Sequence, residues 1–231
     1  MKVFECVQGT PEWAELRCGI PTASQFHRIM KPKGGRSDSA EMYMCELLAE
    51  RLTGQPTVGY TSHWMDRGSE FEAEAVATYE FLTDHEPRKV GFILNDAGTI
   101  GASPDSLVDP NGLLEVKVGK PSTHIALLLQ SDAAYKEHKT QAQGQLWIAQ
   151  REWNDLFAYN PGLPHALYRV QRDEPLIKML ETEVNAFVAE LEENHRQLCA
   201  KGYGRKSRIQ PKPAPDILEI LKESLIATNK H

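Results

Sequence analysis

Residues 109–112, Asp-Pro-Asn-Gly, form a turn sequence between two short runs with strand character, residues 99–102 and 113–118. A chain that reverses at such a turn pairs its flanking runs into a sheet. The same reversal returns Asp105 to the neighbourhood of Glu115 on the next element. This stretch therefore predicts a sheet and, at its edge, two carboxylates close together.

Helices are predicted on both sides of this sheet. Helical spacing and capping signals indicate helices at about 12–18, from residue 22 onward, at about 39–53 and at about 64–82. Residues 89–94 have the pattern of a strand. Later in the chain, a helix is expected at about 133–150, strands at about 153–159 and 166–171, and an amphipathic helix at about 174–199. We therefore expect an α/β (α+β) fold with a small central mixed sheet flanked by helices.

The length of 231 residues suits one domain. We expect residues 1–231 to form it, with a basic Lys/Arg/Pro-rich segment at about 200–215. The chain has no run of eighteen apolar residues, and its first residues lack the apolar core of a secretion signal. We therefore expect no membrane segment and a cytoplasmic location.

The formal net charge of −6 argues mildly against a nucleic-acid partner, but the distribution of charge matters more than its sum. Residues 31–36 form a loop with three positive charges. A second basic run, free of acids between Asn194 and Pro215, contains Lys201, Arg205, Lys206, Arg208 and Lys212. We expect positive charge to be concentrated on one surface, where it could follow a phosphate backbone.

The four cysteines are scattered, at positions 6, 18, 45 and 199, and no two form a C-x-x-C pair. This spacing gives no support to a zinc ribbon or to thioredoxin-like chemistry. It also disfavours an iron–sulfur cluster, which needs cysteines grouped together. We expect four reduced thiols.

The chemistry of the chain is concentrated at Asp105, Glu115 and Lys117. Residues two apart on a strand face the same side, so Glu115 and Lys117 point together while Val116 points into the core. Two adjacent carboxylates repel, and Mg²⁺ or Mn²⁺ between them relieves that repulsion. A lysine beside the metal can hold a water and stabilise a phosphoryl group. Two carboxylates, a metal ion and a lysine together are suited to hydrolysing a phosphodiester. Each part alone also occurs as an ordinary salt bridge or turn.

Together, Pro104-Asp105 and Glu115-Val116-Lys117 resemble the signature of the PD-(D/E)xK nuclease superfamily. Four segments in order are similar to one branch, the YqaJ-like viral alkaline exonuclease family typified by phage lambda exonuclease. They are residues 13–24, 67–72, 102–117 and 141–147. The resemblance implies a restriction-endonuclease-like core.

The resemblance also implies roles for single residues. Asp105 and Glu115 would bind metal, with the carbonyl of Val116 as a further ligand. Lys117 would position the attacking water, and Glu72 would bind metal directly or through a water. The implied cofactor is Mg²⁺, with Mn²⁺ as a substitute and two ions per site.

Four residues are implied to hold the 5′-phosphate of the digested strand: Arg17, Ser24, Ser103 and Gln141. A helix start offers free N–H groups to an anion, and an arginine fork matches a terminal phosphate. Arg17 could instead pair with Glu12 or Glu15. Gln145, one turn after Gln141, is a weaker candidate.

The implied activity is Mg²⁺-dependent 5′→3′ digestion of one strand of linear double-stranded DNA to mononucleotides, leaving a 3′ overhang. By the same resemblance the protein would be a ring-shaped homotrimer of a phage or prophage, working with a single-strand annealing recombinase. Two alternatives stay open. One is a sequence-specific endonuclease or iron–sulfur exonuclease of the same superfamily. The other is a DNA-end-binding or partner-binding module without catalysis, although Asp105, Glu115 and Lys117 are all present.

Overall fold

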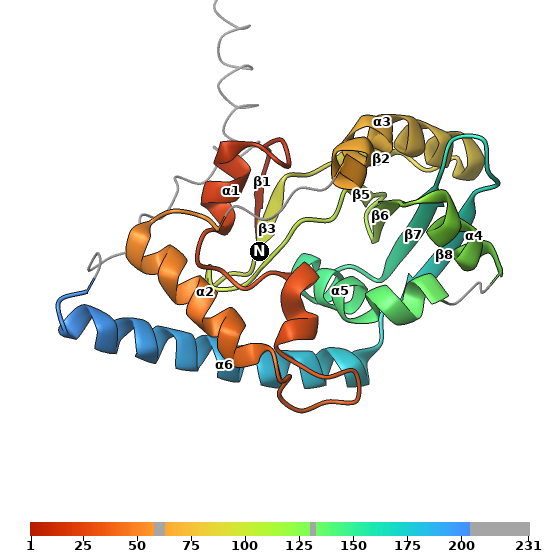
Figure 1. The fold of residues 1–231 in the computed structure, drawn as a ribbon. Helices are drawn as coiled ribbons and strands as arrows, with labels where there is room; N and C mark the ends of the chain where they lie inside the picture. Colours follow the sequence, from red (N-terminus) through yellow and green to blue (C-terminus); the bar gives the residue numbers. More distant parts are fainter. Residues whose placement is uncertain (58–62, 130–132, 204–231) are drawn as a thin grey trace, which may run out of the picture.

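The computed structural model describes residues 1–57, 63–129 and 133–203, and its strands form two sheets (Figure 1). The smaller sheet is antiparallel, with the order β1 (Lys2–Phe4), β3 (Phe92–Leu94), β4 (Gly101–Ala102). The larger sheet has the order β2 (Pro87–Lys89), β5 (Ser106–Val108), β6 (Gly112–Val118), β7 (Trp153–Tyr159), β8 (Ala166–Gln171). Its β6 and β7 are parallel and its other pairs antiparallel, so this sheet is mixed.

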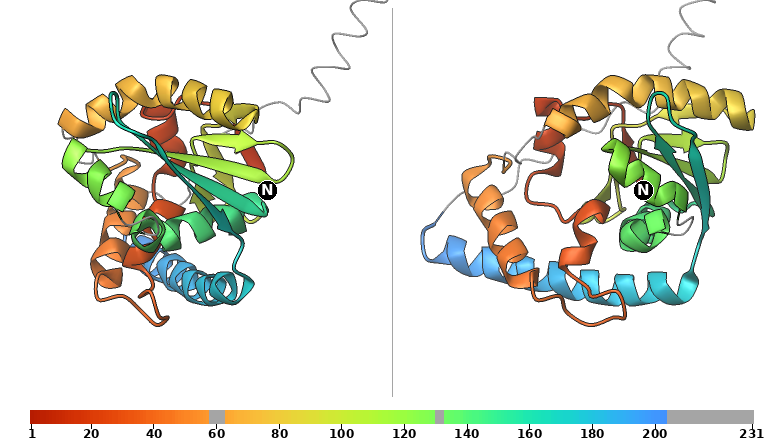
Figure 2. Two further views of the ribbon diagram at one scale, coloured as in Figure 1. Left: turned by 90° about the vertical axis from the view of Figure 1, so that its right-hand side faces the viewer. Right: turned by 45° about the vertical axis from the view of Figure 1, so that its right-hand side comes forward.

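The described residues form seven helices, which pack against the two sheets and against one another. They are α1 (Pro11–Arg17), the 3₁₀ helix η1 (Ala23–Arg28), α2 (Ala40–Thr53), α3 (His63–Thr83), α4 (Pro121–Leu129), α5 (Ala133–Ala149) and α6 (Glu174–Ala200). α3 lies over one face of the sheet and α5 over the other (Figure 2). The predicted α+β class is therefore confirmed. No helix among the described residues is both long and apolar enough to cross a membrane.

The alternation of side chains along β6 divides it between two hydrophobic clusters. Leu114 packs with Tyr79 and Phe157 in the cluster beneath α3. Leu113 belongs to the main core, with Leu146 of α5. Because strand side chains alternate, Glu115 and Lys117 share the α5 face with Leu113. The predicted common orientation of this acid and lysine is confirmed.

The predicted strand at 89–94 was wrong, because residues 87–94 form two strands in different sheets, β2 and β3. The break falls at Gly91, where the chain runs against the backbone of Cys6. A Cβ at residue 91 would lie 2.3 Å from the Cys6 carbonyl oxygen and 2.7 Å from its nitrogen. Only glycine permits this approach, and the backbone leaves one sheet for the other there.

The turn at 109–112 joins β5 to β6, and not β4 to β6 as expected. β5 was missed because its three residues, Ser106–Val108, are too few to show a period. β1 and α4 were also not predicted. Gly54 ends α2 in the left-handed conformation (φ 71°), and Thr10 caps α1, both as expected.

Two predictions about basic segments have different outcomes. In the loop at 31–36, Lys31 pairs with Asp38 at 2.8 Å and Arg36 hydrogen-bonds Glu190, so two of its three positive charges are neutralised by acids. In the segment at 200–215, Lys201 is exposed after α6. The other predicted members, Arg205, Lys206, Arg208 and Lys212, lie outside the described residues.

Candidate active site

Glu115 is buried on β6 and hydrogen-bonded at both carboxylate oxygens. Its Oε1 accepts from Gln141 Nε2 at 2.7 Å and from Lys117 Nζ at 2.8 Å, and its Oε2 accepts from Gln145 Nε2 at 2.6 Å. Lys117 Nζ also lies 3.4 Å from Gln141 Oε1. A charge removed from water needs such partners, since burying it unpaired is costly. Three of the predicted site residues, Glu115, Lys117 and Gln141, therefore meet between β6 and α5.

The network continues to β7 through Asn154. Its Nδ2 donates to Gln145 Oε1 at 2.7 Å, which fixes the amide of Gln145 with its nitrogen toward Glu115. The side-chain oxygen, Asn154 Oδ1, is buried without a hydrogen-bond partner in the described part of the structure. Sheet and helix are thus joined by a line of polar side chains inside an otherwise apolar layer.

Asp105 is held against β6 by two hydrogen bonds. Its carboxylate accepts from the N–H of Val116 at 2.6 Å, and its own N–H donates to the carbonyl of Leu114 at 3.1 Å. The pKa of Asp105 is raised well above its ordinary value, first by burial and then by the charge of Glu115, with Glu72 adding to the effect. The N–H of Val116 opposes this rise more strongly than Lys117 does.

Glu72, the fourth predicted metal ligand, is turned toward a different partner. Its Oε1 accepts from Lys89 Nζ at 3.1 Å, between α3 and β2. Among the described residues, no three His, Cys, Asp or Glu side chains are gathered closely enough to hold a metal ion. The structure therefore brings Asp105 and Glu115 together, with Glu72 near enough to raise the pKa of Asp105 but paired elsewhere.

Three of the four residues predicted to bind phosphate are connected through two further side chains. Arg17 lies with its guanidinium carbon 3.8 Å from the ring centroid of Trp13 and donates to Thr22 Oγ1 at 3.4 Å. Thr22 Oγ1 and Ser24 Oγ share a hydrogen bond of 3.3 Å. The indole Nε1 of Trp13 donates to Ser103 Oγ at 3.0 Å. The fourth residue, Gln141, lies in the Glu115 network.

The charge of Arg17 is held in a partly buried place. Burial lowers its pKa to about 10, while electrostatic interactions with Tyr43 and Glu50 oppose this decrease. The nearby carboxylate is thus Glu50 of α2. In the described residues Arg17 forms no ion pair with Glu12 or Glu15, the partners considered from the sequence.

The predicted capping box at Thr22 was wrong. Residues 23–28 form a 3₁₀ helix, and the Thr22 side chain makes no capping hydrogen bond. Its hydroxyl is already engaged by Arg17 and Ser24. The residues that resembled a helix start therefore belong to a cluster around Arg17. This Arg17 cluster consists of Trp13, Arg17, Thr22, Ser24 and Ser103.

Sequence reasoning missed Trp13, Thr22 and Asn154 and gave Gln145 too little weight. For two of them a local signal existed, because side chains four apart share a helical face. Gln145 follows Gln141 by four residues, and Arg17 follows Trp13 by four. The role of Asn154 in orienting Gln145 depends on the parallel pairing of β6 with β7, which no local pattern reveals.

Comparison with known proteins places this site in a family. The sequence pattern of the YqaJ-like viral recombinase domain matches residues 12–152. No curated protein matches the sequence. Among solved structures, the alkaline exonuclease LHK-Exo from Laribacter hongkongensis is 36% identical with a TM-score of 0.76, covering 84% of this chain and 98% of LHK-Exo. The structure of LHK-Exo in complex with dAMP gives the same values.

A third structure, a phage-related exonuclease from Haemophilus somnus 129PT, is 16% identical with a TM-score of 0.62. It covers 79% of this chain and 96% of its own, and at this identity it supports the fold alone. The matched range contains Glu115 and its three donors, Lys117, Gln141 and Gln145, as well as the Arg17 cluster, while Asn154 lies two residues beyond it. The identity to LHK-Exo extends over most of the chain. This chain belongs to the YqaJ-like viral recombinase family.

Proposed function

We propose that this protein is a Mg²⁺-dependent 5′→3′ exonuclease that digests one strand of linear double-stranded DNA to mononucleotides. The product would be a 3′ single-stranded overhang for recombination by strand annealing. The observation that carries the proposal is the meeting of Asp105, Glu115 and Lys117 at β6, in a chain 36% identical to an alkaline exonuclease.

The donor set fits a hard divalent cation. Two carboxylates lie close enough for Glu115 to raise the pKa of Asp105, and a cation between them would remove that repulsion. Asp105, Glu115 and the carbonyl of Val116 would hold Mg²⁺ or Mn²⁺, two ions per site, with Glu72 as a further ligand. The bound cation would neutralise the carboxylates and polarise the phosphate.

The protein's own residues then have distinct tasks. Lys117 would hold the attacking water and stabilise charge on the phosphate, since its ammonium already lies 2.8 Å from Glu115. Gln141 and Gln145 keep Glu115 in one orientation by bonding both of its oxygens.

The direction of digestion follows from the anion site. An arginine fork with the hydroxyls of Ser24 and Ser103, and with Gln141, would grip the 5′-terminal phosphate. A strand held by that phosphate presents its first phosphodiester to Lys117, so each cycle would release one nucleotide.

Membership of a family of viral recombinases supports the wider setting of this proposal. The protein would act as a homotrimeric ring around DNA, in the cytoplasm of a bacterium that carries the phage or prophage. A single-strand annealing recombinase would take up the overhang.

Digestion of matched linear and covalently closed circular DNA, with Mg²⁺ or with EDTA, tests the proposal. We expect mononucleotides from linear DNA with Mg²⁺ only, and an intact circle. Cutting of the circle would instead indicate an endonuclease, and digestion in EDTA would exclude the role given to the metal.

A further inference from the structure

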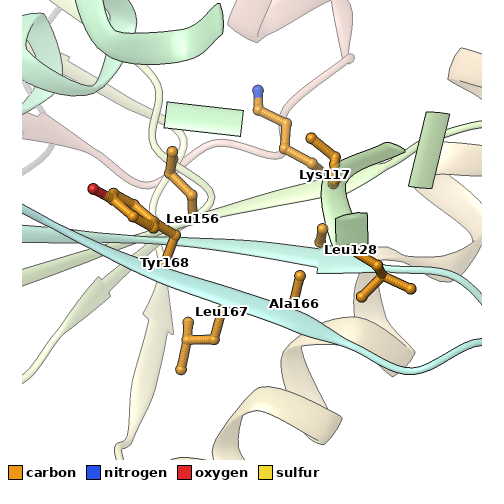
Figure 3. Close-up of a pocket in the computed structure, with 8 residues that line it drawn as sticks. Lys117, Leu128, Leu156, Ala166, Leu167 and Tyr168 are labelled. Carbon is orange, nitrogen blue, oxygen red and sulfur yellow. The ribbon is translucent and has the colours of Figure 1, made fainter. Parts of the chain in front are cut away.

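An apolar pocket of about 220 Å³ lies on the large sheet directly beside Lys117 (Figure 3). The stem of Lys117 forms one wall. The other walls include Leu128 of α4, Leu156 and Ala158 of β7, and Ala166 and Tyr168 of β8. It is therefore continuous with the candidate active site, because one side chain belongs to both.

The strand register explains why the pocket is there. Lys117 pairs with Ala158, which pairs with Ala166, in one row across three strands. In the neighbouring row Leu156 lies between Glu115 and Tyr168. Both rows are on the same face of the sheet. The alanines leave open the space that larger side chains would fill.

α1, which carries Arg17, packs against β3 of the smaller sheet, whereas the pocket lies over β7 and β8 of the larger sheet. β6, the strand of Lys117, lies between α1 on one side and α4 with β8 on the other (Figure 1). A DNA strand held at Arg17 by its terminal phosphate, with the next phosphate at Lys117, would continue toward the pocket.

The side chains along this path are arranged in the order of the groups in a nucleotide. Each nucleotide carries an anionic phosphate followed by a flat base with apolar faces, and here a lysine is followed by apolar walls and an aromatic ring. Bases bind to aromatic and apolar surfaces by stacking, with little regard to their identity. We propose that the pocket receives the base of the second nucleotide of the digested strand, the one on the 3′ side of the bond being cut. This inference rests on the proposed exonuclease function.

A base in this pocket has left its partner strand. The contact made in the pocket would offset the cost of unpairing. Seating of the second base would hold the phosphate beside Lys117 and so favour the first cleavage.

The test uses linear duplexes with a 5′-phosphate in which the second nucleotide is intact or abasic. We expect the wild-type protein to release the first nucleotide roughly ten-fold more slowly from the abasic duplex. A control duplex keeps the second base but has an abasic residue opposite it, which removes pairing alone. It should be digested at least as fast as the intact duplex.

Ala166→Leu fills the pocket from its partly exposed strand, and Ala186→Leu makes the same change on an exposed position of α6 as a control. Ala166→Leu should be slow on the intact duplex yet match the wild-type rate on the abasic one, which also shows that the variant is folded. Ala186→Leu should keep the full difference. If Ala166→Leu digests neither the intact nor the abasic duplex, Tyr168→Ala becomes the test. We expect Tyr168→Ala to digest the two duplexes at equal rates, and a ten-fold difference between them in that variant would contradict the proposal.

Equal rates of the wild type on intact and abasic duplexes would overturn the base pocket and leave the exonuclease function standing. A penalty for an abasic residue at the first position, with none at the second, would also overturn it. Failure of the wild type to digest the intact duplex with Mg²⁺ would instead be a failure of the proposed function.

Discussion

Glu115 has only 6% of its surface exposed and accepts hydrogen bonds from three side chains. Its three donors come from two elements, so the acid fixes the distance between β6 and α5 as well as the position of Lys117. The local part of this arrangement was predictable, because Glu115 and Lys117 are two apart on one strand. The contribution of Gln145 was underestimated, because helical spacing shows a shared face and not what the face meets.

Gln145→Ala should reduce turnover about ten-fold or more and destabilise the fold by roughly 1–3 kcal/mol, because it leaves Glu115 Oε2 and Asn154 Nδ2 without a partner. Gln143→Ala is the matched control. Gln143 is equally buried but bonds the carbonyl of Gln171 and the N–H of Asp173. The Gln143→Ala variant should lose a similar free energy of unfolding, measured by urea denaturation, and keep the kcat of the wild type. A similar loss of kcat in both variants would contradict a positioning role for Gln145.

Arg17 and Trp13 predict a preference for phosphorylated ends. The wild type should digest a 5′-phosphorylated duplex much faster than a 5′-hydroxyl duplex, and Arg17→Ala should remove the difference. Trp13→Phe keeps a ring beneath Arg17 but loses the N–H that reaches Ser103, so it should reduce the preference partly. Initial rates on the two ends measure this. Equal rates of the wild type on 5′-phosphorylated and 5′-hydroxyl duplexes would contradict binding of the 5′-phosphate at Arg17.

At the scale of elements, the site depends on how η1 and α2 are joined. Arg28 of η1 makes two hydrogen bonds to Glu46 of α2, at 2.6 and 2.8 Å. The hydrogen bond from Arg28 is the main cause that lowers the pKa of Glu46. This contact holds η1, which carries Ser24, against α2.

A carboxylate with a lowered pKa stabilises the fold at neutral pH, and this contribution disappears as the pH falls through the lowered pKa, below the ordinary value of 4.5. Glu46→Gln should therefore lower the melting temperature at pH 7 and change it little at pH 3. Glu80→Gln, on an exposed position of α3, is the control with no such pattern. Because Glu46 is partly exposed, the effect should be modest. A deficit of equal size at both pH values would contradict the ion pair.

The elements that could be predicted are those with strong local signals. Gly54 ends α2 because a left-handed residue stops a helix, and the amphipathic pattern of residues 174–199 predicts α6 within a residue at its C-terminus. The division at Gly91 could not be predicted, because it depends on contact with Cys6, which is far away in the sequence. The contacts of Thr22 were mispredicted for another reason, since its partners are near in the sequence. The pattern at residues 22–25 is that of a capping box, but the chain forms a 3₁₀ helix there and the Thr22 hydroxyl bonds Arg17 and Ser24 instead.

At the scale of the whole molecule, a chain of net charge −6 is proposed to enclose DNA. Acidic outer surfaces and a basic channel are compatible in a ring, and metal ions would neutralise part of the charge of Glu72, Asp105 and Glu115. The ring itself is a prediction. Sedimentation equilibrium should give a mass about three times the 26.0 kDa of one chain. A monomer that digests long DNA without dissociating would contradict the ring as the cause of processive digestion.

We propose that Lys117, with Asp105 and Glu115, forms the site of phosphodiester hydrolysis. The most direct measurement compares wild type and Lys117→Ala on 5′-phosphorylated linear duplex DNA with Mg²⁺, recording both mononucleotide release and DNA affinity. We expect the variant to bind DNA nearly as well as the wild type and to release no nucleotides above background. Near-normal release by Lys117→Ala would contradict it.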